Sequence, residues 1–140
     1  MKYLMMVKID PATDEGRRFE KGAPPDPRLM AAIGRHAEEM ARAGILLGTG
    51  GLLPSSRGAR VRAAEGRLSV TDGPFAESKE LIGGYAILEA ASRERAIELG
   101  QQFMQIHVDV LGPAYKGELE IRQMYDDGND CREDAAHNGA

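Results

Sequence analysis

The sequence predicts an α+β fold, a ferredoxin-like split βαβ arrangement with an added hairpin and with both helices on one face of a mostly antiparallel sheet. The apolar segments read in the order strand, helix, two to four strands, helix, strand. Right-handed crossovers then bring both helices to the same face. The interior strands are nevertheless apolar on both sides. Because a large bare apolar face does not usually stay in water, we expect a homodimer that packs sheet to sheet.

The chain begins with a strand that is followed by a long polar stretch. Apolar side chains occupy both faces of residues 3–9, which indicates an interior strand. Pro11, Gly16 and Gly22 interrupt the charged stretch 11–26, which we predict to be a loop.

The first helix has clear signals at both ends. Asp26 suits the N-cap, Pro27 suits the first turn, and Gly44 suits the end. Its apolar stripe comprises Leu29, Ile33, His36 and Met40.

Three strand segments follow this helix. Residues 45–53 form a short strand that we expect to be kinked or bulged at its glycines. Residues 59–63 and 68–71 alternate apolar and polar side chains around a Glu-Gly turn, which predicts a half-exposed hairpin. Residues 83–89 are apolar on both faces.

A second helix and a last strand complete the predicted domain. Ser92 suits the N-cap of this helix, and Gly112 ends it. Its predicted buried stripe comprises Ala96, Leu99, Phe103 and Ile106. The last strand covers residues 119–125. We therefore place one domain at residues 1–125 and a polar tail, expected to fray, at residues 126–140.

Composition excludes several classes of protein. The 140 residues suit one domain, and 18 basic against 22 acidic residues give a net charge of −4. This charge disfavours binding to nucleic acid or to an anionic membrane surface. The single cysteine excludes an internal disulfide. Neither a membrane helix nor a signal peptide is recognisable, so we expect a cytoplasmic protein.

His36 is the candidate general acid or base. Its helical phase places it on the apolar stripe, and histidine titrates near neutral pH. Two interpretations stay open. Helical phase alone favours a core histidine that donates one hydrogen bond, and the alternative is a proton-transfer group beneath a pocket.

Asp72 is the candidate partner of His36. An aspartate before Gly73 and Pro74 readily forms a turn in which its carboxylate caps backbone N–H groups, and spacing alone favours this interpretation. Alternatively, Asp72 orients the imidazole of His36 and stabilises its charged form. Only the distance between the two side chains separates these interpretations.

Other polar residues receive structural interpretations. His107 and Asp109 lack the further ligands that a metal needs, so we expect a solvated helix end. Cys131 lies in the tail, which is a poor platform for a nucleophile. Gly48 and Gly50 lack the helix that follows them in a nucleotide-binding fingerprint. We therefore expect neither a metal nor a cofactor.

One segment resembles a known family. The run TDGPFAESKE at residues 71–80, followed by Gly-Gly-Tyr at residues 83–85, resembles the signature of the YCII-related, or DGPF-domain, family. The resemblance covers roughly residues 1–125.

The resemblance implies a dimeric α+β barrel with a pocket. In that pocket His36 and Asp72 would face each other as the catalytic pair. Gly73 and Pro74 would fix the loop, and Phe75 would line the pocket.

The resemblance also implies functions of different classes. Similar barrel proteins include muconolactone isomerases, and a related YCII-like protein dehalogenates chlorinated muconolactones. One expectation is therefore a cofactor-independent isomerase or lyase in which His36 moves a proton on a lactone or another carbonyl compound. The alternative is a ligand-binding or regulatory module, since some DGPF proteins are encoded with sigma factors. In a third interpretation, the pair of His36 and Asp72 only pins a loop to a helix.

Overall fold

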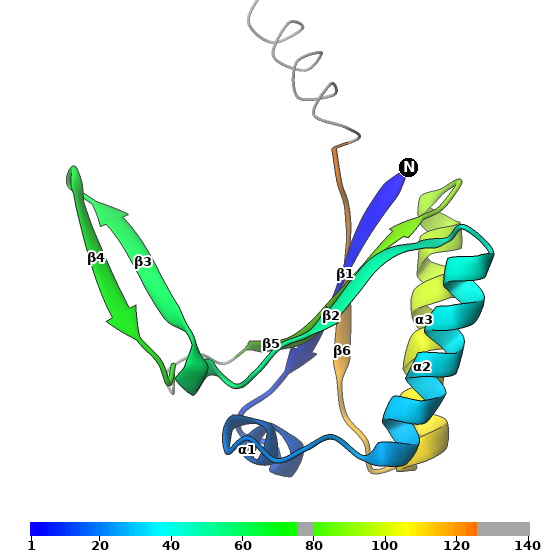
Figure 1. Ribbon diagram of the computed structural model, residues 1–140, viewed down its shortest axis with the longest axis horizontal. Coiled ribbons are helices and arrows are strands. Elements are labelled where there is room, and N and C mark those ends of the chain that lie inside the picture. Colours follow the sequence, from blue (N-terminus) through cyan, green and yellow to red (C-terminus); the bar gives the residue numbers. More distant parts are fainter. Residues whose placement is uncertain (76–79, 126–140) are drawn as a thin grey trace, which may run out of the picture.

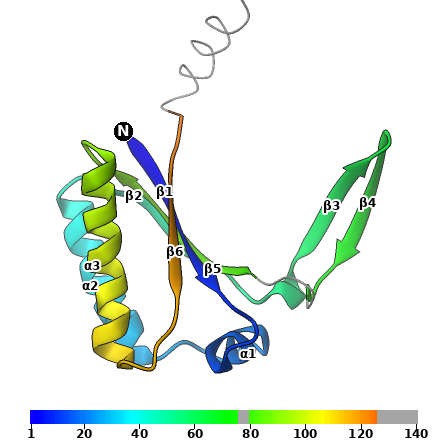
Figure 2. The same ribbon diagram turned by 180° about the vertical axis from the view of Figure 1, so that it is seen from behind.

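The protein forms an α+β fold, which confirms the predicted class (Figures 1 and 2). The structure is a computed structural model that describes residues 1–75 and 80–125. In chain order the elements are β1 (Lys2–Ile9), α1 (Asp14–Glu20), α2 (Pro27–Arg42), β2 (Leu46–Gly51), the 3₁₀ turn η1 (Ser55–Arg57), β3 (Ala59–Ala64), β4 (Arg67–Asp72), β5 (Leu81–Glu89), α3 (Arg93–Leu111) and β6 (Glu118–Gln123). None of the helices in these ranges is long and apolar enough to cross a membrane.

Four strands form an antiparallel sheet in the order β2-β5-β1-β6. Strand β1 is interior, as its two apolar faces predict. Helices α2 and α3 both lie on one face of this sheet (Figures 1 and 2). The register of β2 against β5 shifts between Leu46 and Gly48, which confirms the irregularity predicted at the glycines.

The core lies between this face and the helices. It is built from buried side chains of β1, β5, the residue after β5 and α3, which are Tyr3, Met5, Leu88, Ala90, Ala96 and Leu99. Tyr3 lies opposite Leu88 in the register of β1 against β5. Removal of these side chains from water is the main force that holds the helices on the sheet.

The other face of the sheet carries a second set of apolar side chains. The register pairs Leu4 with Ile87 and Met6 with Tyr85, and Ile82 lies opposite Lys8. These residues alternate with the core residues, so they point away from α2 and α3. We call Leu4, Met6, Ile82, Tyr85 and Ile87 the open face.

Strands β3 and β4 form a separate two-stranded sheet that projects from the body of the molecule (Figures 1 and 2). The predicted hairpin is therefore confirmed, and we call residues 59–72 the arm. The expectation of half-exposed strands is wrong, because every residue of β3 and β4 is exposed. The arm lies apart from the sheet, so neither of its faces is covered.

Helix α1 corrects the loop predicted for residues 11–26. The hydroxyl of Thr13 caps this helix by accepting from the Gly16 N–H at 3.0 Å, and Asp14 and Glu15 occupy the favourable first turn. Gly16 does not interrupt the helix, and its lack of a side chain allows the Asp10 backbone to approach it closely. A Cβ at this position would lie 1.9 Å from the Asp10 carbonyl oxygen.

The caps predicted for α2 and α3 are confirmed. The Asp26 carboxylate accepts from the Arg28 N–H at 2.8 Å, and the Ser92 hydroxyl accepts from the Arg95 N–H at 3.1 Å. The side chain of Arg28 also bonds Asp26 and lowers the pKa of its carboxyl. Gly44, just after α2, has the positive φ of 74° that favours glycine.

Candidate functional site

The structure does not bring His36 and Asp72 together within one chain. His36 lies half-buried on α2, on the helix side of the sheet. Asp72 ends β4 in the arm, and the arm and α2 lie on opposite sides of the sheet (Figures 1 and 2). With the residues that the structure describes, neither the imidazole nor the carboxylate makes a hydrogen bond or an ion pair. The turn-capping interpretation of Asp72 is therefore not observed.

The residues after Asp72 pack against η1. The Gly73 N–H donates to the Gly58 carbonyl at 2.9 Å, and the Phe75 N–H donates to the Ser55 hydroxyl at 3.0 Å. A Cβ on Gly73 would lie 1.7 Å from the Ser55 carbonyl oxygen, so only glycine fits here. This segment holds the base of the arm, and Pro74 follows Gly73 through a cis peptide bond.

Helix α1 supplies the carboxylate that completes this junction. One oxygen of Glu20 accepts from the Ser55 N–H at 2.9 Å, and the other accepts from the Ser55 hydroxyl. The Ser55 hydroxyl therefore donates to α1 and accepts from the Phe75 N–H at the same time. We call Glu20, Ser55, Gly58, Gly73 and Phe75 the arm root.

Sequence reasoning missed Glu20 and Ser55. Their contact spans 35 residues, and the contact of Ser55 with Phe75 spans 20. Glu20 lies in the stretch predicted to be a loop, and Ser55 lies in a Pro-Ser-Ser turn. No local pattern joins residues this far apart. A correct prediction of α1 would have placed Glu20 on a helix, but it would not have identified Ser55 as its partner.

Phe75 lies under a cation. The guanidinium carbon of Arg60 is 3.9 Å from the centroid of the Phe75 ring, which is a cation–π contact. The Phe75 ring is half-buried. Its predicted role in lining a pocket stays a prediction.

Asp72 stands at the base of an apolar strip. It pairs with Ala59, and the next pair on the same side of the arm is Val61 with Val70. Its carboxylate is exposed and points from a backbone that the arm root holds in place. An ionised carboxylate only accepts hydrogen bonds. This position therefore suits a ligand that has an apolar body and a hydroxyl or amine group.

A charged cluster lies on the sheet beside the open face. The ammonium group of Lys8 is 2.9 Å from a carboxylate oxygen of Glu120 and 3.1 Å from one of Glu80. These hydrogen bonds raise the pKa of Lys8 to about 12, and the bond to Glu120 has the larger effect. The hydrogen bond from Lys8 lowers the pKa of Glu120. Lys8 therefore stays charged at neutral pH and is unsuited to act as a general base.

The Lys8 cluster predicts a pH-dependent effect of Glu120→Gln. Because the folded pKa of Glu120 lies below its unfolded value, its carboxylate stabilises the fold at neutral pH. That contribution is lost as pH falls through the folded pKa. We expect Glu120→Gln to lower the melting temperature at pH 7, by an amount that shrinks toward acid pH.

Glu118→Gln is the matched control for this experiment. It removes the same charge from the same strand, and Glu118 makes no ion pair with the residues that the structure describes. Equal melting temperatures of the two variants at pH 7 would contradict a stabilising contact between Lys8 and Glu120. A difference between them that widens toward acid pH would contradict it as well. Thermal denaturation over a pH series measures both outcomes.

His107 corrects the prediction of a solvated helix end. It is only 5% exposed, with Nδ1 3.0 Å from the Phe103 carbonyl oxygen. Its ring meets Phe103 edge-on at 4.8 Å and stacks on Tyr115 at 5.3 Å. Burial and, after it, the charge of Glu15 raise the pKa of Tyr115 to about 12. The contacts with Phe103 and Tyr115 explain why His107 is buried. Asp109 is exposed, as expected.

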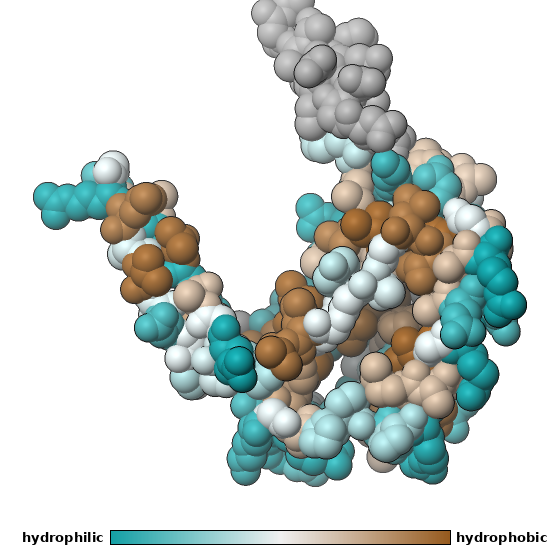
Figure 3. All heavy atoms as spheres, viewed as in Figure 1, coloured by the Kyte–Doolittle hydropathy of each residue, from teal (hydrophilic) through white to brown (hydrophobic). Residues whose placement is uncertain are grey.

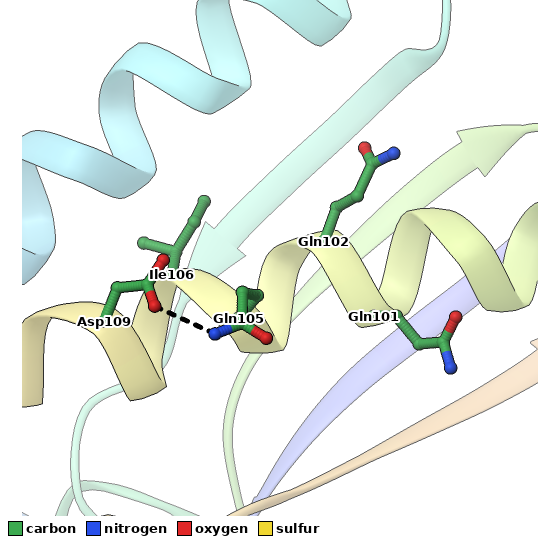
Figure 4. A pocket seen from close by; sticks show the side chains of 5 residues that line it. All are labelled: Gln101, Gln102, Gln105, Ile106 and Asp109. Atoms are coloured by element: carbon green, nitrogen blue, oxygen red, sulfur yellow. Dashed lines mark hydrogen bonds between the residues drawn. The ribbon is translucent and has the colours of Figure 1, made fainter. Parts of the chain in front are cut away.

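A surface hollow on α3 holds none of the predicted site residues (Figure 4). It is lined by Gln101, Gln102, Gln105, Ile106 and Asp109. Four of these side chains are exposed, and the amide of Gln105 donates to Asp109 at 2.8 Å. The hollow therefore presents solvated polar groups without a buried one that could select a ligand.

Metal binding finds no support in the described ranges, where no three histidine, cysteine, aspartate or glutamate side chains come together. Cys131 and the tail at residues 126–140 lie outside the described residues.

Comparison with known proteins gives two matches. A family model described as the YCII-related domain matches residues 1–107, which include α2, the arm and most of α3. An uncharacterized protein of Rhizobium meliloti (strain 1021) is 32% identical over 99 residues, which are 71% of this chain and 75% of that relative. The segment that suggested the resemblance contributes Gly73 and Phe75 to the arm root. The chain belongs to the YCII-related family.

Proposed function

We propose that this protein binds a small organic molecule as a homodimer, at a site around Asp72 on the arm root. The observation that carries this proposal is the state of the Asp72 carboxylate. It is exposed, it has no bonding partner among the described residues, and hydrogen bonds to η1 and α1 fix the backbone beside it. A rigid support lowers the entropy that is lost when a ligand binds.

The apolar surface of one chain supports the proposed homodimer. Ile82 and Tyr85 on the open face are 42% and 39% exposed, and the arm adds further exposed apolar side chains. A second copy would remove both surfaces from water and would give the site at Asp72 a second wall. A ligand site at such an interface is enclosed without a deep cavity in either chain.

Proton transfer by His36 and Asp72 is the second candidate function. Both side chains keep unused bonding capacity among the described residues, which favours a role beyond packing. The imidazole would take a proton from a carbon beside a carbonyl group and return it elsewhere, and the carboxylate would stabilise the imidazolium. This chemistry needs a second copy to bring Asp72 to His36, because α2, which carries His36, and the arm, which carries Asp72, lie on opposite sides of the sheet in one chain (Figure 1).

Two variants and two matched ligands test the proposal. Asp72→Asn and His36→Gln are compared with the unmodified chain in the presence of unsaturated γ-lactones with and without a hydroxyl group. Binding is measured by thermal shift and titration calorimetry, and turnover is measured by NMR. We expect the hydroxylated lactone to bind the unmodified chain and the His36→Gln variant with equal affinity. Its affinity for the Asp72→Asn variant should be at least tenfold lower.

The pattern across the variants decides between the candidates. Turnover that both substitutions reduce by about 10²–10⁴-fold would replace the binding proposal by the proton-transfer candidate. Hydroxylated-lactone binding that Asp72→Asn leaves unchanged would contradict a site at Asp72. Equal binding of the two lactones would contradict the hydrogen bond that the carboxylate is proposed to accept.

A further inference from the structure

We propose that the acidic tail at residues 126–140 binds the basic side of the arm of its own chain. This contact needs neither the proposed ligand nor a second copy, so it is independent of the proposed function. It gives a partner to a charged surface that the proposed function leaves unused.

One side of the arm carries arginines and hydroxyl groups but no carboxylate. Side chains that pair across an antiparallel hairpin point to the same side of it. The register therefore brings five polar side chains together on what we call the basic side, which are Arg60, Arg62, Arg67, Ser69 and Thr71. All five residues are exposed, and in Figure 3 the arm stands clear of the body. Asp72 pairs with Ala59 and so belongs to the opposite side of the arm.

Two of these arginines have no anionic partner in the structure. The guanidinium groups of Arg62 and Arg67 form no ion pair with any residue of the ranges 1–75 and 80–125. Arg62 lies opposite Ser69, and Arg67 precedes Ser69 by two residues, so the Cα atoms of the two arginines are about 7–8 Å apart. Their like charges repel each other in a hairpin that is marginally stable by itself. An anionic partner would convert this repulsion into an attraction.

The third arginine is held in place on the same side. The guanidinium carbon of Arg60 lies 3.9 Å from the centroid of the Phe75 ring, which belongs to the arm root. This contact restricts the long side chain before any anion arrives. It therefore lowers the entropy that is lost when the basic side binds a partner.

The tail accounts for the whole net charge of the chain. Residues 1–125 contain 17 basic and 17 acidic residues, whereas residues 126–140 contain one arginine against five acidic residues, which gives the net charge of −4. The acidic residues of the tail are Asp126, Asp127, Asp130, Glu133 and Asp134. A concentration of one charge at a chain end is typical of an interaction segment. Charge complementarity thus favours the tail as the occupant of the basic side.

Carboxylates suit the basic side better than the phosphates of a nucleic acid. A guanidinium group binds a carboxylate through two parallel hydrogen bonds, which makes this pair stronger than a contact between neutral groups. Binding of a nucleic acid instead depends on a surplus of positive charge. Residues 1–125 have no such surplus, and the charge of the tail would repel phosphates.

The position and the length of the tail suit a contact within one chain. Strand β6, after which the tail begins, ends on the side of the molecule to which the tip of the arm points (Figures 1 and 2). The 15 residues of the tail span about 50 Å when extended, and a small domain is about 30 Å across. Attachment to the same chain also gives a segment an effective concentration in the millimolar range, at which even a weak contact is populated.

Cys131 makes this contact directly measurable, because it is the single cysteine of the chain and lies among the acidic residues of the tail. A nitroxide is attached to Cys131 of the full ¹⁵N-labelled chain. NMR then measures how strongly the nitroxide broadens each backbone amide signal, with the reduced nitroxide as reference. A large excess of unlabelled chain without nitroxide restricts the effect to contacts within one chain. Spectra are recorded at low salt and at about 1 M salt, where charges are screened beyond about 3 Å.

At low salt we expect the amide signals of Arg62 and Ser69 to lose at least half of their intensity, and we expect them to recover at high salt. Arg62→Gln combined with Arg67→Gln should abolish the broadening. Arg35→Gln combined with Arg93→Gln is the matched control and should leave the broadening unchanged. It removes the same charge from exposed helix positions that form no ion pair with the described residues.

Arm signals that keep their full intensity at low salt would overturn the proposal. Broadening that survives in the variant without Arg62 and Arg67 would overturn it as well. If circular dichroism shows that variant to be unfolded, Asp126→Asn, Asp127→Asn and Asp130→Asn are combined instead, because they remove charge from the tail and leave the arm intact. The broadening should then be lost in the same way, and its persistence would refute the contact.

Discussion

Replacing Leu99 by alanine is expected to lower the free energy of unfolding by about 2–5 kcal/mol. Leu99 is 3% exposed and packs in the core between α3 and β1, in the cluster that includes Tyr3 and Met5. The truncation removes buried methyl groups and leaves a cavity that the sheet beneath α3 cannot fill by collapse. Urea denaturation measures the change.

Val108→Ala is the matched control for Leu99→Ala. Val108 lies on the same helix but is 43% exposed, so its truncation should change stability by well under 1 kcal/mol. Both variants are compared at one protein concentration, because association of two copies adds to the apparent stability. A Leu99→Ala chain as stable as Val108→Ala would contradict the placement of the core.

Replacing Gly73 by alanine is expected to disrupt the arm root. The added Cβ would lie 1.7 Å from the Ser55 carbonyl oxygen and 2.6 Å from the carbonyl carbon, and both are backbone atoms that cannot rotate away. Relief of the clash separates the segment after Asp72 from η1 and breaks the bond between the Phe75 N–H and the Ser55 hydroxyl. We expect a loss of about 1–3 kcal/mol, as for other overpacked sites, together with loss of the dimer.

Gly51→Ala controls for the loss of a glycine as such. Gly51 lies in β2, and a Cβ there meets no atom within 4 Å. This variant should keep the stability and the molar mass of the unmodified chain. If Gly73→Ala behaves in the same way in urea denaturation and light scattering, the arm is not held by the contact between Gly73 and Ser55.

The sequence predicts most of the fold because most of its signals are local. Asp26 with Pro27 and Ser92 mark two helix starts through side-chain bonds that span at most three residues. Alternation of apolar residues in β1 and β5 reveals interior strands for the same reason. These signals arise within a turn or a strand and need no knowledge of the rest of the chain.

The errors arise where tertiary contacts decide. Gly16 reads as part of a loop, but it lies within α1, where only glycine fits because a Cβ would lie 1.9 Å from the Asp10 carbonyl oxygen. His107 follows Phe103 by four residues and so shares its helical stripe, but its polarity suggests solvent until Tyr115 covers it. The alternation in β3 predicts an apolar side without telling whether that side meets this chain or another.

The candidate site is only partly readable from the sequence. The segment from Asp72 to Phe75 carries a local signal, because Pro74 fixes its own φ and Gly73 tolerates a close backbone contact. The junction with Glu20 and Ser55 depends on contacts between distant segments and leaves no local pattern. The distance from His36 to Asp72 depends on where the arm projects, which the periodicity of its strands does not encode.

The molar mass of the unmodified chain in solution tests the central claim most directly, because the arm and the open face are proposed to exist for a second copy. Sedimentation equilibrium over a series of protein concentrations measures this mass without any variant or ligand. The account predicts a species of twice the 15.2 kDa chain mass. A mass of one chain at every concentration would contradict it.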